Sequence, residues 1–281
     1  MARAEEMGIR HDVAIEWRSS LDGLVPASLT IVATIATGRA ALIERLLGIG
    51  DRRFLVEKIV CQSSDEFSRL LKKLTEYRAK AWMNCPRRYY PFYERLRLAL
   101  AGVPPITMKV SAGDRGLGCN AIHYLDIFEY LTGRQPVSLT GALLLNRVAV
   151  NRRGPELAEF SGTLAGATPA EDVLDITFAP ATLRSALVTV NAPAAEAFAD
   201  EGLDFAVHLS SPNADSWSRT EFGHRNVSDV TTQIARDILD SDDCRLATLE
   251  RSARLHALLF NVFNDHLERV TGARPSLCPI T

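Results

Sequence analysis

The 281-residue sequence lacks the features that mark several specialised classes of protein. Its five cysteines are an odd number and none stands in a Cys-x-x-Cys pair, which argues against a disulfide framework or a structural zinc site. No stretch reaches the ~18 consecutive apolar residues of a membrane span, and residues 1–12 lack the apolar core of a signal peptide. Reduced thiols in a cytoplasmic protein are the simplest interpretation.

The chain also lacks an excess of positive charge. Its formal net charge is -2 and no block of basic residues stands out, so there is no electrostatic reason to expect a nucleic-acid partner. Repeats and low-complexity segments are missing as well. What remains is an ordinary globular composition, 47% hydrophobic with a mean hydropathy near zero, in a length that accommodates one or two domains.

The first half of the chain alternates between the patterns of strands and helices. β-Branched apolar runs predict buried parallel strands, and a capping box at Ser63 and Glu66 predicts the start of a helix whose apolar positions repeat at helical spacing. The predicted strands are residues 13–17, 28–34, 54–60 and 81–85, and a further helix is predicted at residues 39–47. Strands joined by helices predict a parallel sheet with right-handed crossovers.

The second half has a different pattern. A short strand at residues 106–110 leads through a glycine-rich turn into a helix at residues 120–132, which Gly133 ends. Longer strands without helices between them then indicate an open, largely antiparallel sheet. They fall within residues 137–150 and 174–207, and helices at residues 226–239 and 249–270 follow. The fold class expected is therefore α/β plus α+β, with a Rossmann-like domain at residues 1–86 and an α+β domain at residues 87–281.

Several segments between residues 28 and 133 occur in the order of a known family. They are SLTIVAT followed by Arg39, Glu57-Lys58 with Ile59 in place of proline, WMNCPRRYYPFYERL, and GLGCNAIHYLDIFEYLTG. Together they resemble the glucose-fructose oxidoreductase/inositol dehydrogenase (Gfo/Idh/MocA) family. The segments NCPRR and GCNAIHYLD, together with the C-terminal CPIT, most resemble those of family members from bacterial surface-polysaccharide loci. The resemblance implies an oxidoreductase that uses NAD or NADP on a sugar or nucleotide-linked sugar, and a homo-oligomer formed through the sheet of the second domain.

One part of the family pattern is missing. The family begins with a strand, a GxGxxG turn and a helix that bind the dinucleotide pyrophosphate, and nothing before Val13 matches this unit. We therefore expect the chain to start inside the cofactor-binding domain and to bind NAD(H) and NADP(H) weakly. The alternative to an enzyme is a truncated, non-catalytic relative that binds a sugar or a partner without cofactor. A second glycine run, from Gly116 to Ala121, fits GxGxxA but lacks the acidic residue that a dinucleotide site needs about 20 positions later.

His123 and Lys58 are the predicted catalytic residues. Oxidation of a carbinol needs a base with a pKa near neutrality, and His123 stands near the start of a helix, with Asn120 and Asp126 three residues to either side. Asn120 and Asp126 are predicted to contact the substrate. The alternative is a histidine satisfied by helix packing. The resemblance implies a carboxylate four residues before the histidine, where this chain has Cys119.

Lys58 follows the apolar part of a predicted strand, at the sheet edge where α/β folds bind ligands; the alternative is a surface lysine. The resemblance adds Thr34, Arg39 and Glu57 to Lys58 as cofactor-binding residues.

Arg87, Arg88 and Tyr89 are predicted to bind the substrate. Two arginines and a tyrosine at a strand end suit a carboxylate or phosphate and a stacked sugar ring. An ordinary interdomain turn is the equal alternative. His256 lies in an apolar helical stripe and is predicted to be a core histidine, and no metal site is expected.

Overall fold

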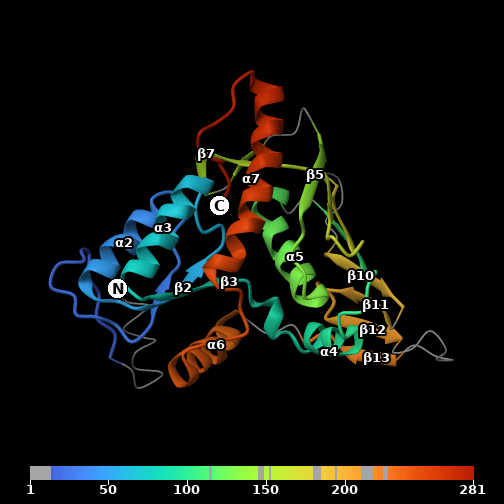
Figure 1. Ribbon diagram of the computed structural model, residues 1–281, viewed down its shortest axis with the longest axis horizontal. Helices are drawn as coiled ribbons and strands as arrows, with labels where there is room; N and C mark the ends of the chain where they lie inside the picture. The colour runs from blue at the N-terminus through green and yellow to red at the C-terminus, as the bar shows by residue number, and fades with distance from the viewer. Residues whose placement is uncertain are drawn as a thin grey trace.

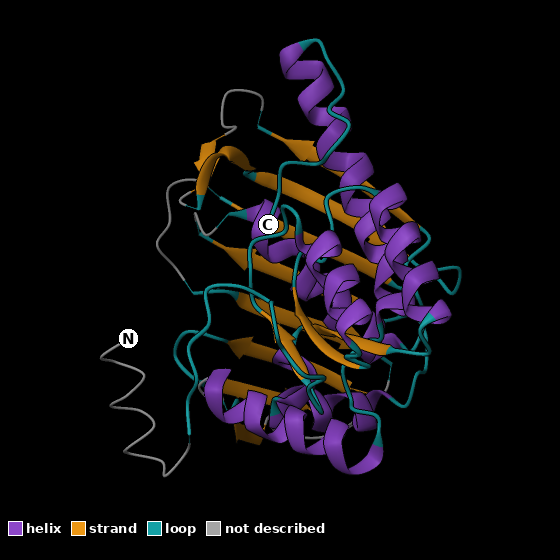
Figure 2. Ribbon diagram, turned by 90° about the vertical axis from the view of Figure 1, so that its left-hand side faces the viewer, coloured by secondary structure: helices purple, strands orange, loops and turns teal. Residues whose placement is uncertain are grey.

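The computed structural model describes residues 14–113, 116–144, 149–151, 153–179, 185–193, 195–209, 218–223 and 227–281. The described chain contains a small parallel sheet with helices beside it and a large mixed sheet with helices across one of its faces (Figures 1 and 2). This arrangement confirms the predicted fold class.

The small sheet consists of β1 (Thr30–Val32), β2 (Arg53–Glu57) and β3 (Lys80–Asn84), paired in parallel in that order. Helices α2 (Arg39–Ile49) and α3 (Ser64–Glu76) connect the strands and lie side by side (Figure 1). The order along the chain equals the order in space, as the strand–helix alternation predicts.

Helix α3 begins as the capping box predicts. The Ser63 side chain accepts a hydrogen bond from the backbone N–H of Glu66 at 3.2 Å, and the Glu66 carboxylate accepts one from the backbone N–H of Gln62 at 3.0 Å. Phe67 and Leu70 on the apolar face are buried against neighbouring elements, so the local sequence alone accounts for this helix.

The predicted strand at residues 13–17 is wrong. Val13 lies outside the described residues, and residues 14–17 are not in a strand. Ile15 and Trp17 are 42% and 57% exposed. An alternating apolar pattern forms a strand only beside a partner that buries one face, and no described strand pairs with this segment.

The large sheet has the strand order β13-β12-β11-β10-β4-β9-β8-β5 among the described residues. Its neighbouring strands are antiparallel except β4 and β9, which confirms the predicted open, largely antiparallel sheet. The strands in chain order are β4 (Thr107–Ala112), β5 (Ser138–Leu143), β8 (Gly162–Ala167), β9 (Val173–Phe178), β10 (Leu187–Ala192), β11 (Ala195–Asp200), β12 (Phe205–Leu209) and β13 (Ser218–Glu221). A separate hairpin pairs β6 (Ala149–Asn151) with β7 (Gly154–Glu159).

The remaining helical segments all follow β3 along the chain. They are a 3₁₀ turn η1 (Pro86–Tyr89), α4 (Pro91–Leu100), α5 (Leu117–Thr132), α6 (Val227–Ser241) and α7 (Leu249–Thr271). Helix α4 is not predicted from the sequence, although Pro91 at its first position is a typical start. All strands of the small sheet precede residue 86 and all described strands of the large sheet follow it. The division into two domains at that residue stays a prediction.

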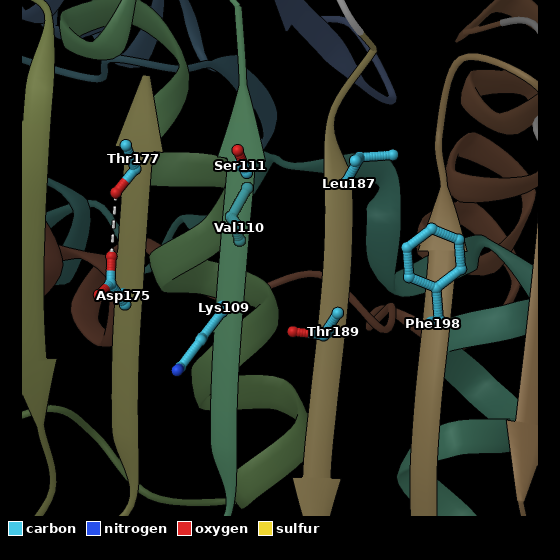
Figure 3. Close-up of a pocket in the computed structure, with 8 residues that line it drawn as sticks. All are labelled: Lys109, Val110, Ser111, Asp175, Thr177, Leu187, Thr189 and Phe198. Atoms are coloured by element: carbon cyan, nitrogen blue, oxygen red, sulfur yellow. Dashed lines mark hydrogen bonds between the residues drawn. The ribbon is translucent and has the colours of Figure 1, made fainter. Parts of the chain in front are cut away.

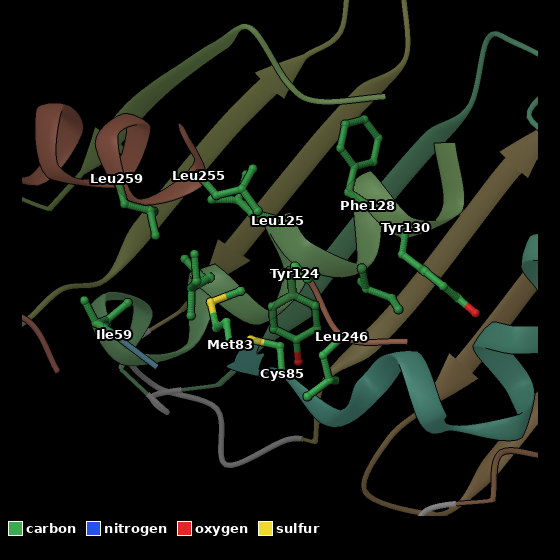
Figure 4. Close-up of a cluster of buried hydrophobic side chains, with 14 of the residues drawn as sticks. Ile59, Met83, Cys85, Tyr124, Leu125, Phe128, Tyr130, Leu246, Leu255 and Leu259 are labelled. Carbon is green, nitrogen blue, oxygen red and sulfur yellow. The ribbon is translucent and has the colours of Figure 1, made fainter. Parts of the chain in front are cut away.

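Helices α5 and α7 bring the two sheets into one core. Helix α5 is buried around nearly its whole circumference, and α7 packs against α3, β3, α5 and β5. Ile59, just beyond β2, and Met83 of β3 lie in one cluster with Leu125 of α5 and Leu255 and Leu259 of α7 (Figure 4). This shared core fixes the ends of β2 and β3 against the start of α5, where the candidate site lies.

Candidate functional site

Lys58 lies where the end of β2 meets the first turn of α5. Its side chain is buried, and its Nζ donates hydrogen bonds to the backbone oxygen of Cys119 at 3.0 Å and to that of Thr281 at 3.3 Å. The surface-lysine alternative is therefore wrong. The peptide bond from Lys58 to Ile59 is cis.

The last residues of the chain complete this side of the site. Thr281 is fully buried, and its hydroxyl accepts a hydrogen bond from the backbone N–H of Ala36 at 2.8 Å, just beyond β1. Gln62 holds the same segment twice, by donating from its amide to Ile280 at 3.2 Å and by accepting from the backbone N–H of Cys278 at 2.7 Å. The sequence gives no local signal for this segment's position beyond its apolar composition.

His123 lies one turn further along α5 than Cys119. Part of its side chain is accessible, but its Nδ1 is buried and has no hydrogen-bond partner among the described residues. Burial, and then the charges of Arg87 and Lys58, hold the pKa of His123 well below its ordinary value. The imidazole is therefore neutral at neutral pH, the form that accepts a proton.

Asp126 and Arg88 bind each other in the interior. The guanidinium donates from Nε and Nη2 to the two carboxylate oxygens at 2.9 and 2.8 Å, and both residues are buried. Burial raises the pKa of Asp126, and Arg88 opposes that effect. Because this pair takes up both charged groups, we do not carry forward the predicted substrate-binding role of either residue.

Arg87 is held by a cluster that sequence reasoning missed. Its Nε and Nη2 donate to the two oxygens of Glu201, at the end of β11, at 2.8 and 2.7 Å, and its guanidinium lies over the Tyr124 ring. Tyr93 and Tyr124 also donate to Glu201. Burial alone would raise the pKa of Glu201, but Arg87 and these hydroxyls outweigh it and lower the pKa. Arg87 stays close enough to His123 to affect its pKa.

Tyr89 points away from this cluster. Its hydroxyl donates to Asp237 of α6 at 2.6 Å and accepts from the backbone N–H of Arg245 at 3.2 Å. The Arg245 guanidinium lies 4.1 Å from the centre of the Tyr89 ring. These contacts dock α6 and leave the ring face covered, so stacking of Tyr89 on a sugar is not carried forward. Asn120 remains at the start of α5, where its side chain donates to the backbone oxygen of Gly116 at 2.9 Å.

The residues predicted to bind cofactor lie together at the carboxyl ends of β1 and β2. Arg39 is buried and donates to the backbone oxygens of Thr34, Glu57 and Ile59. Burial lowers the pKa of Arg39 to about 10. The guanidinium thus ties the two strand ends together. The Glu57 carboxylate accepts from the Asn84 amide at 2.6 Å, on the same edge.

The glycine run at the start of α5 serves the protein's own packing. A Cβ at Gly116 would collide with the Glu159 carboxylate, and one at Gly118 would press on Ile280 and Phe160. These contacts favour the interpretation that the GxGxxA match is not a dinucleotide turn. His256 is a core histidine, as predicted: it accepts from the backbone N–H of Val60 at 3.1 Å, and burial lowers its pKa to about 4.

The structure thus brings Lys58, Cys119, His123 and Thr281 together at the end of the small sheet. Within the described ranges, no group of His, Cys, Asp and Glu has the arrangement of a metal site, and no helix there combines the length and apolarity needed to cross a membrane. The residues fit the nicotinamide end of NAD(P), because a neutral His123 with an unpartnered ring nitrogen and a lysine lie at the carboxyl edge of a parallel sheet.

Comparison with solved structures supports this interpretation of the fold. UDP-N-acetylglucosamine 3-dehydrogenase GnnA from Acidithiobacillus ferrooxidans superposes with a TM-score of 0.74 at 16% identity, over 93% of this chain and 85% of that chain. An oxidoreductase from Agrobacterium radiobacter, in complex with NAD+, L-tartaric acid and magnesium, superposes with a TM-score of 0.71 at 13% identity, over 92% and 84%. The chain has the fold of the Gfo/Idh/MocA oxidoreductases.

The Gfo/Idh/MocA fold is not restricted to enzymes of one substrate. A super-repressor mutant of Gal80p from Saccharomyces cerevisiae superposes with a TM-score of 0.73 at 12% identity, over 95% of this chain and 85% of that chain. No protein-family model matches the sequence, and no curated protein matches it. Function is therefore argued from the site rather than from the Gfo/Idh/MocA fold.

Proposed function

We propose that this protein is an NAD(P)-dependent oxidoreductase that removes a hydride from a carbinol carbon of a sugar. The observation that carries the proposal is a neutral, half-buried His123 near Lys58 at the carboxyl edge of the small sheet. Bound NAD(P) supplies the nicotinamide ring that accepts the hydride. Thr34, Arg39 and Glu57 line the edge on which that cofactor is proposed to lie.

His123 and Lys58 divide the work on the substrate hydroxyl. The neutral imidazole of His123 takes the hydroxyl proton as the carbon loses its hydride, and becomes imidazolium. The Lys58 ammonium stabilises the negative charge that develops on the sugar oxygen. We propose that Asn120, three residues before His123, binds a neighbouring hydroxyl of the sugar. We expect the shared core of α5 and α7 to shield one side of the reacting atoms from water.

Nucleotide-linked sugars are the substrate class that we propose, in surface-polysaccharide biosynthesis in the cytoplasm. Arg87 lies near His123 and pairs with Glu201, so the proposal requires a phosphate-bearing sugar to share the Arg87 guanidinium with that carboxylate. A binding protein without redox activity is the competing class, because the same fold occurs in Gal80p.

Substitution of Lys58 by methionine tests the proposed function. We expect kcat for sugar oxidation, per folded molecule, to fall about 10²-fold because the developing oxyanion loses its cation. The melting temperature should also fall, because Cys119 and Thr281 lose their hydrogen bonds from Lys58. The exposed Lys72→Met is the matched control. Turnover per folded molecule equal to the parent's in Lys58→Met would show that Lys58 is structural.

Arg87 is expected to distinguish anionic from neutral sugars. Arg87→Gln should raise KM for a phosphate-bearing sugar about 10–100-fold more than for its neutral counterpart, the worth of a charge-assisted hydrogen bond. Steady-state kinetics on the two substrates measures the ratio, with exposed Arg254→Gln as control. An equal rise for both sugars would assign Arg87 to packing against Glu201 alone.

We also propose that the protein forms a homo-oligomer through the large sheet. The face opposite the helices carries adjacent side chains from four strands, namely Asp175, Lys109, Thr189 and Phe198, around a shallow pocket (Figure 3). Helices leave this face uncovered in the described residues, which suits the same face of a second copy.

The oligomer prediction is tested by light scattering. Thr189→Arg places a second cation beside Lys109 and should convert the assembly to a monomer. Exposed Leu98→Arg on α4 should leave the mass unchanged. A monomeric parent protein would contradict the proposal.

A further inference from the structure

A carboxylate from β7 reaches the first turn of α5, beside the candidate site. Glu159 is the last residue of β7, and its Oε2 accepts a hydrogen bond from the backbone N–H of Cys119 at 3.3 Å. The backbone N–H of Gly118 also stabilises the charged carboxylate. A Cβ at Gly116 would collide with the Glu159 carboxylate, and one at Gly118 would lie 3.1 Å from its Oε2. The glycines thus admit the carboxylate.

Glu159 and Lys58 bind the backbone N–H and the backbone oxygen of the same residue, Cys119. Lys58 donates to the backbone oxygen of Cys119 at 3.0 Å, while Glu159 accepts from its backbone N–H. Burial raises the pKa of Glu159, and its hydrogen bonds with Cys119 and the charge of Lys58 oppose this. The strand end is itself anchored, because Ala158 donates to the backbone oxygen of Pro279 at 2.6 Å.

The position of Glu159 matters because the sequence has no carboxylate four residues before His123. Cys119 stands four residues before His123, where the family resemblance implies a carboxylate, and a thiol is a poor replacement for one. The structure delivers a carboxylate to the same turn from a position 40 residues later in the chain.

We propose that Glu159 is a positioning residue for the oxidation site: its negative charge complements Lys58 and fixes the helix turn that carries Cys119 and, four residues on, His123. This role rests on the proposed function. A mere helix cap would need only an acceptor oxygen, whereas this role needs the charge.

Glu159→Gln separates the two roles, because glutamine keeps an acceptor oxygen of the same reach. We expect kcat to fall about 10²-fold through loss of alignment, with KM nearly unchanged. Glu159→Asp, which keeps the charge, should recover part of the loss. Exposed Glu156→Gln on the same strand is the control. A kcat for Glu159→Gln equal to the parent's would overturn the proposal.

Alkylation of Cys119 provides a readout that does not depend on turnover. The groups that face this thiol are Glu159, which raises its pKa, and Lys58 and Arg153, which lower it. Removing the charge of Glu159 should lower the thiol pKa, so iodoacetamide should modify Cys119 several-fold faster at neutral pH, as measured by peptide mass spectrometry.

The two readouts separate failure of this inference from failure of the proposed function. An unchanged alkylation rate in Glu159→Gln would overturn the inference, whatever the parent's activity. Faster alkylation of Cys119 in Glu159→Gln, in a protein that oxidises no sugar, would establish that the charge of Glu159 acts on Cys119. It would overturn the proposed function, and with it the role of Glu159 in the reaction.

Discussion

Replacement of His123 by alanine is expected to lower kcat for sugar oxidation about 10²–10⁴-fold, the usual contribution of a general base. His123 is close enough to Lys58 for the lysine charge to lower its pKa, and its Nδ1 lacks a hydrogen-bond partner among the described residues. Water is a weak base in comparison, so the substrate hydroxyl would keep its proton. Because the buried Nδ1 of His123 has no hydrogen-bond partner among the described residues, the melting temperature should change little.

The pH profile gives a second measure of the same residue. Burial, Arg87 and Lys58 lower the pKa of His123, so the imidazole stays neutral as the pH falls below its ordinary pKa of about 6.5. The acid limb of kcat/KM should therefore lie below that pH and disappear in His123→Ala. His208→Ala in β12 is the control, because His208 bonds to Ser218 far along the large sheet. An unchanged kcat in His123→Ala would show that His123 is not the general base.

Loss of Arg88 is expected to cost about 3–5 kcal/mol of unfolding free energy, because it leaves a buried carboxylate without its cation. Asp126 is fully buried and both of its oxygens bond to Arg88. Urea unfolding of Arg88→Met measures the loss. The double variant Arg88→Met, Asp126→Leu removes both charges and should recover most of it.

The single variant Arg88→Met also tests whether the pair with Asp126 is buried. A loss of only about 1 kcal/mol in the single variant would mean that the pair is exposed to solvent. If Arg88→Met had normal stability and a raised KM, the result would indicate that Arg88 and Asp126 bind the substrate.

The fold could be predicted from the sequence wherever local pattern decides the structure. The capping box of α3, the apolar strands β2 and β3 and the glycine after α5 each carry their own signal. Residues 14–17 have the residue pattern of a strand but do not form one. A strand forms only beside a neighbouring strand, and the local sequence does not show whether such a neighbour is present. The order of the eight described strands in the large sheet likewise depends on long-range contacts.

The candidate site could be predicted only in part for the same reason. His123 and Lys58 stand in recognisable local surroundings, and the structure joins them through Cys119. Thr281, Glu159 and Glu201 come from distant segments, so spacing gave no sign of them. The charges of Arg88 and Asp126 predict substrate binding, because sequence shows charge but does not show that each residue is the other's partner.

The most direct test of the proposed oxidation is transfer of deuterium from a sugar to the nicotinamide. A nucleotide-linked sugar deuterated at its carbinol carbons is incubated with the 281-residue chain. Because weak cofactor binding is expected, NAD+ or NADP+ is added at concentrations that occupy a weak site, as checked by titration, and the reduced cofactor is analysed by mass spectrometry. The account predicts one deuterium per reduced nicotinamide, with the rate reduced by His123→Ala. Sugar binding measured by calorimetry, without deuterium transfer to either cofactor, would contradict it and identify a binding protein with an oxidoreductase fold.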